Sequence, residues 1–585
     1  MKEMSTDNLL QEFPPLSTQA WEEAIAKDLK GSAYGKKLIW QTEEGLAVKP
    51  YYRTEDVLGL LHLDGAHGDP LCLRGAQSTG NWRIREEIDL ADPEEANLSA
   101  RHAVAAGAEE IAFCNVQIHH ASDLGMLLAG LQEIPVNFEN AKEPLLRLLI
   151  ERLNTQKATS RIGTGFDPLT NVDFAAELVR AATPALVPFA IHGGEFEESG
   201  ATAVEEVGLT LAAAVDFLSE MQARKVNIDR AAASIAFRFA IGSNFFFQMA
   251  KFRAFRLLWA QVVERFGGSN ESARALIHAR TSRWNKTVYD PHVNILRGTT
   301  EAMSAALGGV DSITVAAFDE CYKMPDEASR RLARNTQILL KQEALLSRVA
   351  DPGAGSYYLE VVTDFIAREG WKLMQKIEGA GGYRKAQMDG QMQRMLEQSL
   401  AAKEKAVESR RRIFTGTNDF ANLAEKALDR IDSSHSTGHR RATESYEELR
   451  LRTERHAART GKCPRVLLAE FGDVKMRTAR SGFAASFFAC AGFDIVTLQF
   501  HSVDDIAAED ADLIVMCSSD AEYLSLATEL SSRFHAIGRT TPIVIAGNPD
   551  TAEQLRAAGV ADFVHIRSNP IEVLTKWQQR LGIEE

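Results

Sequence analysis

The sequence has few cysteines, and they form no paired motif. Six cysteines are scattered over 585 residues, and no two are spaced as Cys-x-x-Cys. This usage is typical of a reducing compartment, in which cysteine acts as a small apolar side chain. The sequence also lacks an apolar run long enough to cross a bilayer, and its polar N-terminus is unlike a signal peptide or a transit sequence. We therefore expect a cytoplasmic protein with no membrane segment.

The sequence has fewer basic than acidic residues. The 66 lysines and arginines are outnumbered by 80 aspartates and glutamates, so the formal net charge is −14. This balance argues against nucleic-acid binding, which needs clustered basic residues. Apolar residues make up 45% of the chain, which excludes global disorder. The length is sufficient for two or more domains.

Residues 1–30 are predicted to form an N-terminal arm. Phe13–Pro15 blocks helix formation, and Ser17 can cap a helix over Thr18–Leu29. The arm offers a set of candidate apolar contacts: Leu16, Ala20, Trp21, Ile25 and Leu29. Such an arm either contacts a neighbouring subunit or packs on its own domain. Both interpretations remain open, and we expect a subunit contact.

Residues 31–415 alternate between short apolar runs and helical patterns. This alternation predicts a parallel α/β sheet, most economically a (β/α)8 TIM barrel, although periodicity alone does not exclude a large open sheet. The expected strands include Ile111–Val116, Leu186–Ile191, Ser234–Ala240 and Ile313–Ala316. The expected helices include Asp173–Ala182, Ala203–Ala223 and Asn244–Phe266. Residues 416–461 are richly charged and are predicted to form a helical linker.

Residues 462–585 alternate again and predict a flavodoxin-like domain with a doubly wound parallel sheet. The expected strands are Arg465–Ala469, Asp494–Leu498, Leu513–Cys517, Pro542–Ala546 and Phe563–Ile566. A loop from Phe471 should follow the first strand. The helices expected after it are Gly482–Ala491, Ala521–Ala536, Thr551–Ala558 and Ile571–Leu581.

Several stretches, in order along the chain, resemble the methylmalonyl-CoA mutase family. They are LIWQTEEGLAVKPYY from Leu38, NWRIREEIDL from Asn81, DPL at Asp167, FRFAIGSNFFFQMAKFRAFRLLWA from Phe237, TSRWNKTVYDPHVNILRGTTEAMSAALGG from Thr281, and RRLARNTQ with VADPGAGSYYLE between Arg330 and Glu360. The resemblance implies a TIM barrel that takes an acyl-CoA along its axis. It also implies a flavodoxin-like domain that holds adenosylcobalamin.

The cobalamin-binding positions of the family are altered in this sequence. Catalytic members carry Asp-x-His-x-x-Gly after the first strand of the cobalamin domain, with the histidine as the lower cobalt ligand. Lys475 and Arg477 stand at the positions of that aspartate and histidine, and an arginine has no lone pair to offer a metal. Asp520 and His565 occupy loops that meet the cofactor in the family. The resemblance therefore implies a chain with no metal ligand and no cofactor-binding residue of its own.

The catalytic positions of the barrel are altered as well. Catalytic members place a tyrosine against the substrate where Glu87 stands, and a histidine on the thioester carbonyl where Glu195 stands. A carboxylate has the wrong polarity to stabilise an electron-rich carbonyl oxygen. His192 is three residues away from the second position. We expect no catalytic residue at these places.

We therefore expect a non-catalytic small subunit of a heterodimeric mutase of this family. Its partner would be a catalytic large subunit that binds adenosylcobalamin and the acyl-CoA. Two alternatives remain. The chain could be a catalytic mutase of another acyl-CoA, with Glu87 and Glu195 as specificity groups, or a stand-alone acyl-CoA or nucleotide-binding regulatory protein.

Overall fold

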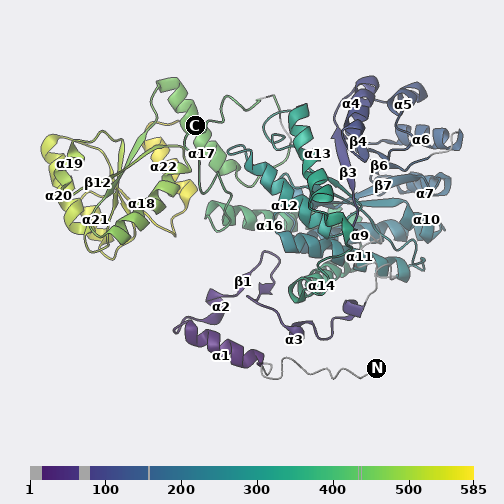
Figure 1. Ribbon diagram of the computed structural model, residues 1–585, viewed down its shortest axis with the longest axis horizontal. Helices are drawn as coiled ribbons and strands as arrows, with labels where there is room; N and C mark the ends of the chain where they lie inside the picture. Colours follow the sequence, from purple (N-terminus) through teal and green to yellow (C-terminus); the bar gives the residue numbers. More distant parts are fainter. Residues whose placement is uncertain (1–15, 65–79, 156–158, 433, 436–437, 585) are drawn as a thin grey trace, which may run out of the picture.

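A computed structural model describes residues 16–64, 80–155, 159–432, 434–435 and 438–584 (Figure 1). Phe13–Pro15, which was predicted to stiffen the arm, lies outside the described residues. Two sheets organise the chain: a closed eight-stranded barrel and an open five-stranded sheet. Among the described residues, no helix is sufficiently long and apolar to cross a membrane.

The barrel confirms the predicted TIM-barrel class. Its strand order is β10-β3-β4-β5-β6-β7-β8-β9, and every neighbouring pair is parallel. Closure occurs where Ser312 pairs with Arg83. The strands are β3 (Arg83–Ile88), β4 (Glu110–Phe113), β5 (Val136–Phe138), β6 (Ile162–Phe166), β7 (Leu186–His192), β8 (Ile235–Ile241), β9 (Leu276–Thr281) and β10 (Ser312–Thr314).

Helices follow the strands; most of them cover the outside of the barrel, and α8 (Gly193–Glu198) lies at its mouth. They are α4 (Pro93–Ala105), α5 (Ala121–Leu127), α6 (Glu143–Thr155), α7 (Val172–Ala181), α8, α9 (Ala203–Ala223), α10 (Ile228–Ala233), α11 (Phe245–Arg265), α12 (Val293–Leu307) and α13 (Glu327–Gln342). Beyond them lie the 3₁₀ turn η2 (Leu346–Arg348) and the helices α14 (Tyr357–Gly379), α15 (Tyr383–Met388) and α16 (Gln391–Glu408).

The start of helix α9 shows how the sequence determines where a helix begins. It begins at Ala203, as predicted, because Thr202 and Glu205 form a capping box that satisfies the first backbone N–H groups. Most of its residues are buried, and it packs between the barrel and α14. Aromatic rings hold the neighbouring helix α11, since Phe237 on β8 contacts Phe255 and Trp259 edge to face.

The C-terminal sheet confirms the predicted flavodoxin-like class. Its order is β12-β11-β13-β14-β15, with all neighbours parallel. The strands are β11 (Arg465–Glu470), β12 (Asp494–Gln499), β13 (Leu513–Cys517), β14 (Ile543–Ala546) and β15 (Asp562–Val564). The helices are α18 (Val474–Ala489), α19 (Val503–Ala507), α20 (Tyr523–Ile537), α21 (Ala552–Ala557) and α22 (Pro570–Arg580).

The loop after β11 is shorter than predicted, so the expected helix start at Gly482 is wrong. Helix α18 begins at Val474 because the side chain of Asp473 caps it, accepting a hydrogen bond from the backbone N–H of Met476. Lys475 and Arg477 consequently lie in the first turns of a helix and not in an open loop.

The linker joins both parts of the chain. Helix α17 (Glu444–Thr460) runs between them, and residues 409–443 contain no α-helix in their described part (Figure 1). One apolar core contains Val407 of α16 and Tyr446 of α17 together with Val466 of β11. The linker is therefore part of the packing of the C-terminal sheet.

The N-terminal segment lies along one side of the barrel (purple in Figure 1). It consists of α1 (Thr18–Asp28), α2 (Tyr34–Lys37), the two-stranded hairpin β1 (Trp40–Gln41) and β2 (Ala47–Val48), α3 (Thr54–Val57) and the 3₁₀ turn η1 (Leu61–Asp64). Helix α1 starts after Ser17, whose side chain caps it as predicted. No residue of α1 is buried.

Candidate functional site

A cavity of about 810 Å³ opens at the carboxyl ends of the barrel strands. This is the end at which TIM barrels place their functional groups. Its lining combines carboxylates with arginines from different strands, among them Glu87 on β3, Arg238 on β8 and Arg280 on β9. The predicted positions Glu87 and Glu195 both lie in its wall.

Ion pairs fill the barrel interior next to this cavity. Arg85 is nearly buried and donates from Nε to Oε1 of Glu110 at 2.7 Å. Asn137 donates to the same carboxylate oxygen at 2.7 Å. Glu139 accepts from both Arg85 and Arg238. Because long side chains from four strands meet here, they occupy space along the barrel axis.

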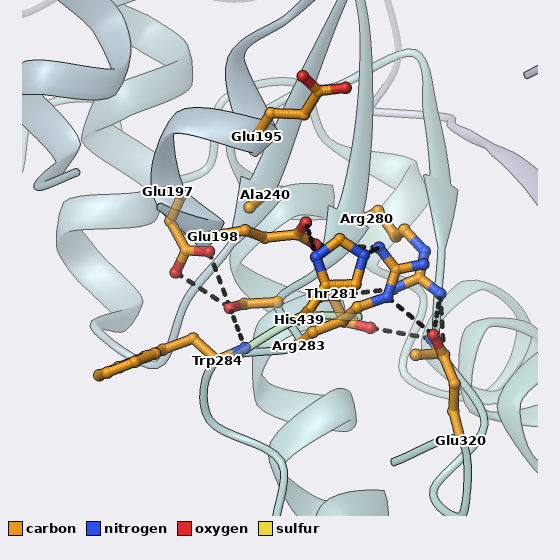
Figure 2. A network of polar contacts seen from close by, with 12 residues as sticks. Glu195, Glu197, Glu198, Ala240, Arg280, Thr281, Arg283, Trp284, Glu320 and His439 are labelled. Atoms are coloured by element: carbon orange, nitrogen blue, oxygen red, sulfur yellow. Dashed lines mark hydrogen bonds and ion pairs between the residues drawn. The ribbon is translucent and has the colours of Figure 1, made fainter. Parts of the chain in front are cut away.

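A second set of ion pairs crosses the cavity at its mouth (Figure 2). Arg280 donates from Nε to the Glu87 carboxylate at 3.0 and 3.2 Å and from Nη2 at 3.1 Å. The same Nη2 lies 2.8 Å from both carboxylate oxygens of Glu320. Glu320 also accepts from Nε of Arg283 at 2.9 Å. Burial alone would raise the pKa of Glu320, but the two arginines together lower it to about 2.

The network continues into the linker. Arg283 donates from Nη1 to Oε1 of Glu198 at 3.0 Å, and His439 Nδ1 lies 2.9 Å from Oε2 of the same carboxylate (Figure 2). His439 Nε2 lies 3.3 Å from Arg283 Nη1. An arginine can only donate, so Nε2 accepts and the proton of a neutral His439 resides on Nδ1, facing Glu198.

We call residues 432–442 the linker strap; residues 433, 436 and 437 fall outside its described part. Three backbone carbonyls of the barrel loops hold this strap across the mouth. The pairs are Asp432 N to Tyr322 O at 2.9 Å, His435 Nε2 to Glu320 O at 2.7 Å, and Ala442 N to Trp284 O at 2.7 Å. The linker therefore forms part of the cavity wall.

Glu195 stands apart from the network. Its side chain is 74% exposed and points away from the paired residues (Figure 2). The ring of His192 lies beside it, with Nδ1 3.7 Å from Oε1 of Glu195. His192 Nε2 donates to the Gly165 carbonyl at 2.9 Å, while burial, followed by the charge of Arg238, lowers its pKa to about 4. Although this side chain is exposed to the cavity, the surrounding wall partly shields it from bulk solvent, and this shielding, followed by the charges of Glu198 and Asp167, raises the pKa of Glu195.

Each arginine that lines the cavity contacts a carboxylate. The pairs are Arg85 with Glu110 and Glu139, Arg238 with Glu139, Arg280 with Glu87 and Glu320, Arg283 with Glu198 and Glu320, Arg330 with Glu327, and Arg334 with Glu86 and Glu327. The charges of these arginines are therefore already balanced within the chain, which weakens their attraction for an external anion.

The other four predicted positions lie at the carboxyl edge of the C-terminal sheet: Lys475 and Arg477 on α18, Asp520 after β13 and His565 after β15. Lys475 is exposed on α18. Arg477 donates from Nη1 to the Gly472 carbonyl at 3.2 Å and from Nη2 to Gln499 at 3.0 Å. His565 follows β15, and its Nδ1 accepts from the backbone N–H of Arg567 at 3.1 Å. Partial burial and Arg567 lower its pKa.

Side chains cover the backbone between these positions. Asp520 accepts from Arg480 at 3.0 Å, and Arg480 lies over Gly547, where an added Cβ would stand 2.9 Å from Arg480 Nη1. At Gly472 an added Cβ would stand 2.3 Å from the Glu522 carboxylate. The loops that should leave room for a ligand are thus occupied by the chain itself. Among the described residues, no group of three or more His, Cys, Asp or Glu is arranged to hold a metal ion.

Sequence reasoning missed most of the mouth network. Glu198, Arg280, Arg283, Glu320 and His439 were not singled out, although a signal for such pairs exists in the strands. Charged residues recur at every second position in RIREEI of β3, and alternate residues of a strand point to the same face. In a closed barrel this pattern places charges inside and requires partners of opposite sign on other strands.

Comparisons with known proteins give a consistent result. The family model described as methylmalonyl-CoA mutase matches residues 168–467. The chain is 35% identical to the methylmalonyl-CoA mutase small subunit of Porphyromonas gingivalis over 99% of both chains. It is 30% identical to the small subunit of Streptomyces virginiae over 98% of both. With the large subunit of P. gingivalis it is 29% identical over 73% of this chain and 67% of that one.

Proposed function

Since the chain belongs to the methylmalonyl-CoA mutase family, a family of isomerases, we propose that it is a non-catalytic small subunit. Its partner would be a catalytic large subunit, and the heterodimer would interconvert methylmalonyl-CoA and succinyl-CoA. Adenosylcobalamin and the acyl-CoA would bind to the partner. The chain aligns with nearly the full length of two small subunits but with only 67% of a large subunit, which supports a small-subunit role over a large-subunit role.

One observation carries the proposal: the arginines that line the cavity form ion pairs with carboxylates of the same chain. Glu87 stands where catalytic members place a tyrosine against the substrate, and it is held on Arg280 by three hydrogen bonds. The Arg85–Glu110 pair and Glu139 occupy the axis along which an acyl-CoA would thread. Displacing buried ion pairs without replacing their hydrogen bonds is costly, so this arrangement disfavours acyl-CoA binding.

The carboxyl edge of the C-terminal sheet does not fit cobalamin. The arginine at the position of the cobalt ligand cannot coordinate a metal, and it bonds instead to Gly472 and Gln499. The Arg480–Asp520 pair and Glu522 cover the glycines that should allow a ligand to approach the backbone. Replacing a single residue would therefore not open this edge.

The partner is inferred from the comparisons and from the arm. P. gingivalis has both a small and a large subunit, and this chain resembles each of them. Leu16 and Trp21 of the arm are large apolar side chains that are 63% and 46% exposed. A lasting subunit interface would bury on the order of 2,000 Å² or more, and these side chains are available to it.

Co-expression with a homologous large subunit tests the proposal. The two chains should elute together, all bound corrinoid should be lost when the large subunit is omitted, and mutase activity should require both. Separate purification of each chain and reconstitution at a one-to-one ratio provides the control. Stoichiometric corrinoid on the isolated chain, or mutase turnover by it alone, would overturn the proposal.

A further inference from the structure

Arg280 offers a complete binding edge to a carboxylate. Its Nε and Nη2 face the two oxygens of Glu87 at 3.0 to 3.2 Å. This side-on, two-pronged contact is the geometry by which arginine recognises free carboxylates. Glu87 reaches Arg280 from β3 across β10, since β10 lies between β3 and β9 in the barrel. The contact is therefore a tertiary one, made inside the cavity.

The rest of the network fixes Arg280 in place. Glu320 holds Nη2 at 2.8 Å through both of its oxygens, and Arg283 in turn holds Glu320 at 2.9 Å. Neither of these contacts involves Nε of Arg280. If the Glu87 carboxylate were removed, the guanidinium would keep its position and would present an unfilled two-donor edge to a cavity of about 810 Å³.

We propose that this cavity is a carboxylate-binding site whose occupant is the chain's own Glu87. The native protein is closed to external carboxylates because an internal one already fills the edge of Arg280. Without Glu87, the site takes a small monocarboxylate from solution. This inference concerns the same cavity as the proposed function, but it does not depend on the partner subunit.

Acetate is the ligand that matches the removed atoms. A Glu87→Ala substitution deletes a CH2 group and a carboxylate, and acetate supplies a methyl group and a carboxylate. Propionate and butyrate add methylene groups, for which the cavity has space. Chloride has no pair of oxygens for the guanidinium edge, and sulfate, which can pair with that edge, is a tetrahedral dianion unlike the planar monoanion that was removed. Selectivity for acetate over these anions is therefore part of the expectation.

The test measures thermal unfolding of the full-length chain in sodium acetate and in sodium chloride at equal ionic strength and neutral pH. The Glu87→Ala variant should unfold at a lower temperature than the wild type in chloride. Acetate should raise the unfolding temperature of Glu87→Ala until the site is saturated, and calorimetry should give a millimolar dissociation constant. Acetate should leave the unfolding temperature of the wild type unchanged. A Glu87→Ala, Arg280→Gln double variant should lose the acetate response.

Two results would overturn the inference: equal midpoints of Glu87→Ala in acetate and chloride, or a saturable acetate response that survives in the double variant. If Glu87→Ala does not fold in chloride, Glu87→Ser, whose short side chain also leaves the place of the carboxylate empty, undergoes the same comparison and decides it. If acetate does not stabilise Glu87→Ala but the chain pairs normally with the large subunit, this inference is wrong and the proposed function stands. Failure to pair, with acetate binding intact, would remove the proposed function alone.

Discussion

His439 lies in the linker strap, and its Nδ1 is 2.9 Å from Oε2 of Glu198 at the barrel mouth. Glu198 is in turn bound to Arg283, and Arg283 to Glu320. Figure 2 shows this chain of charged contacts from His439 to Arg280, and Arg280 extends it to Glu87 inside the cavity. The position of the linker and the arrangement of the cavity are expected to depend on each other.

Replacing His439 with alanine should loosen the linker strap. The substitution removes a hydrogen bond to Glu198 and leaves the strap held through its backbone contacts, His435 and the ion pairs of Arg440 and Arg441. We expect faster hydrogen exchange and faster limited proteolysis within residues 432–442. Arg440→Ala is the matched control, because Arg440 is exposed and pairs with Glu404 outside the network. Equal rates in the two variants would contradict the expectation.

Trp21→Ala should weaken pairing with the large subunit. Trp21 stacks on Tyr51 with ring centroids 5.2 Å apart and remains 46% exposed. Tryptophans of this kind often dominate interface energies, so a loss of tenfold or more in affinity, about 1.4 kcal/mol, is expected. Sedimentation of the mixed subunits measures it.

Glu23→Ala, on the same helix, is the control for Trp21→Ala. Deletion of residues 1–30 should have a larger effect than Trp21→Ala. If the arm packs only on its own barrel, both changes would instead lower the thermal stability of the isolated chain and leave the pairing affinity as it was.

Restoring one catalytic position should not restore catalysis. Glu87→Tyr would leave Arg85 and Glu110 on the barrel axis, and Glu195→His would leave Glu87 on Arg280. Groups that act as a unit contribute little when only one is replaced. Each single variant, assayed without the partner and with adenosylcobalamin and methylmalonyl-CoA, should give background turnover. The reconstituted pair in the same assay is the positive control, and measurable turnover by either variant alone would refute the expectation.

His192 should make the folded chain sensitive to mild acid. Burial and Arg238 lower its pKa to about 4, from 6.5 for a free histidine, while Glu139 opposes that shift and Glu195 faces the ring. The unfolded chain therefore binds a proton that the folded chain does not. The stabilisation is complete above pH 6.5 and is lost as the pH falls from 6.5 through about 4.

The measurement is the free energy of unfolding in urea from about pH 7 to about pH 4.5. His192→Gln keeps an N–H that can donate to Gly165 and has no titrating ring, so its stability should fall less steeply than that of the wild type. His501→Gln replaces an exposed histidine of the C-terminal domain and serves as the control. Parallel curves for wild type and His192→Gln would disprove the assignment.

Local sequence rules predicted most of the secondary structure. Periodicity located α9 at Ala203–Ala223 and β13 at Leu513–Cys517 without error, because both segments are strongly apolar and clearly bounded. The predicted start of helix α18 was too late, because the side chain of Asp473 caps the helix at Val474. The short helix α19 (Val503–Ala507) was missed because five residues carry too little periodicity.

The candidate site was predicted only in part. Glu87 and Glu195, which the sequence singled out separately, both line one cavity, since the ends of parallel strands meet at one face of a barrel. The partners of Glu87 could not be read from the sequence, because Arg280 is 193 residues away and the pairing depends on strand order and register. The role of His439 depends on the path of the linker, which no local pattern specifies.

The exposure of helix α1 bears on how rapidly the chain is degraded in a cell. Its eleven residues bury no side chain, and an isolated helix of this length is marginal in water. A copy without its partner would therefore present a fraying segment with exposed Leu16 and Trp21, which is a ready substrate for quality-control proteases. We expect surplus copies to be degraded and paired copies to persist, so that turnover would balance the amounts of the two subunits.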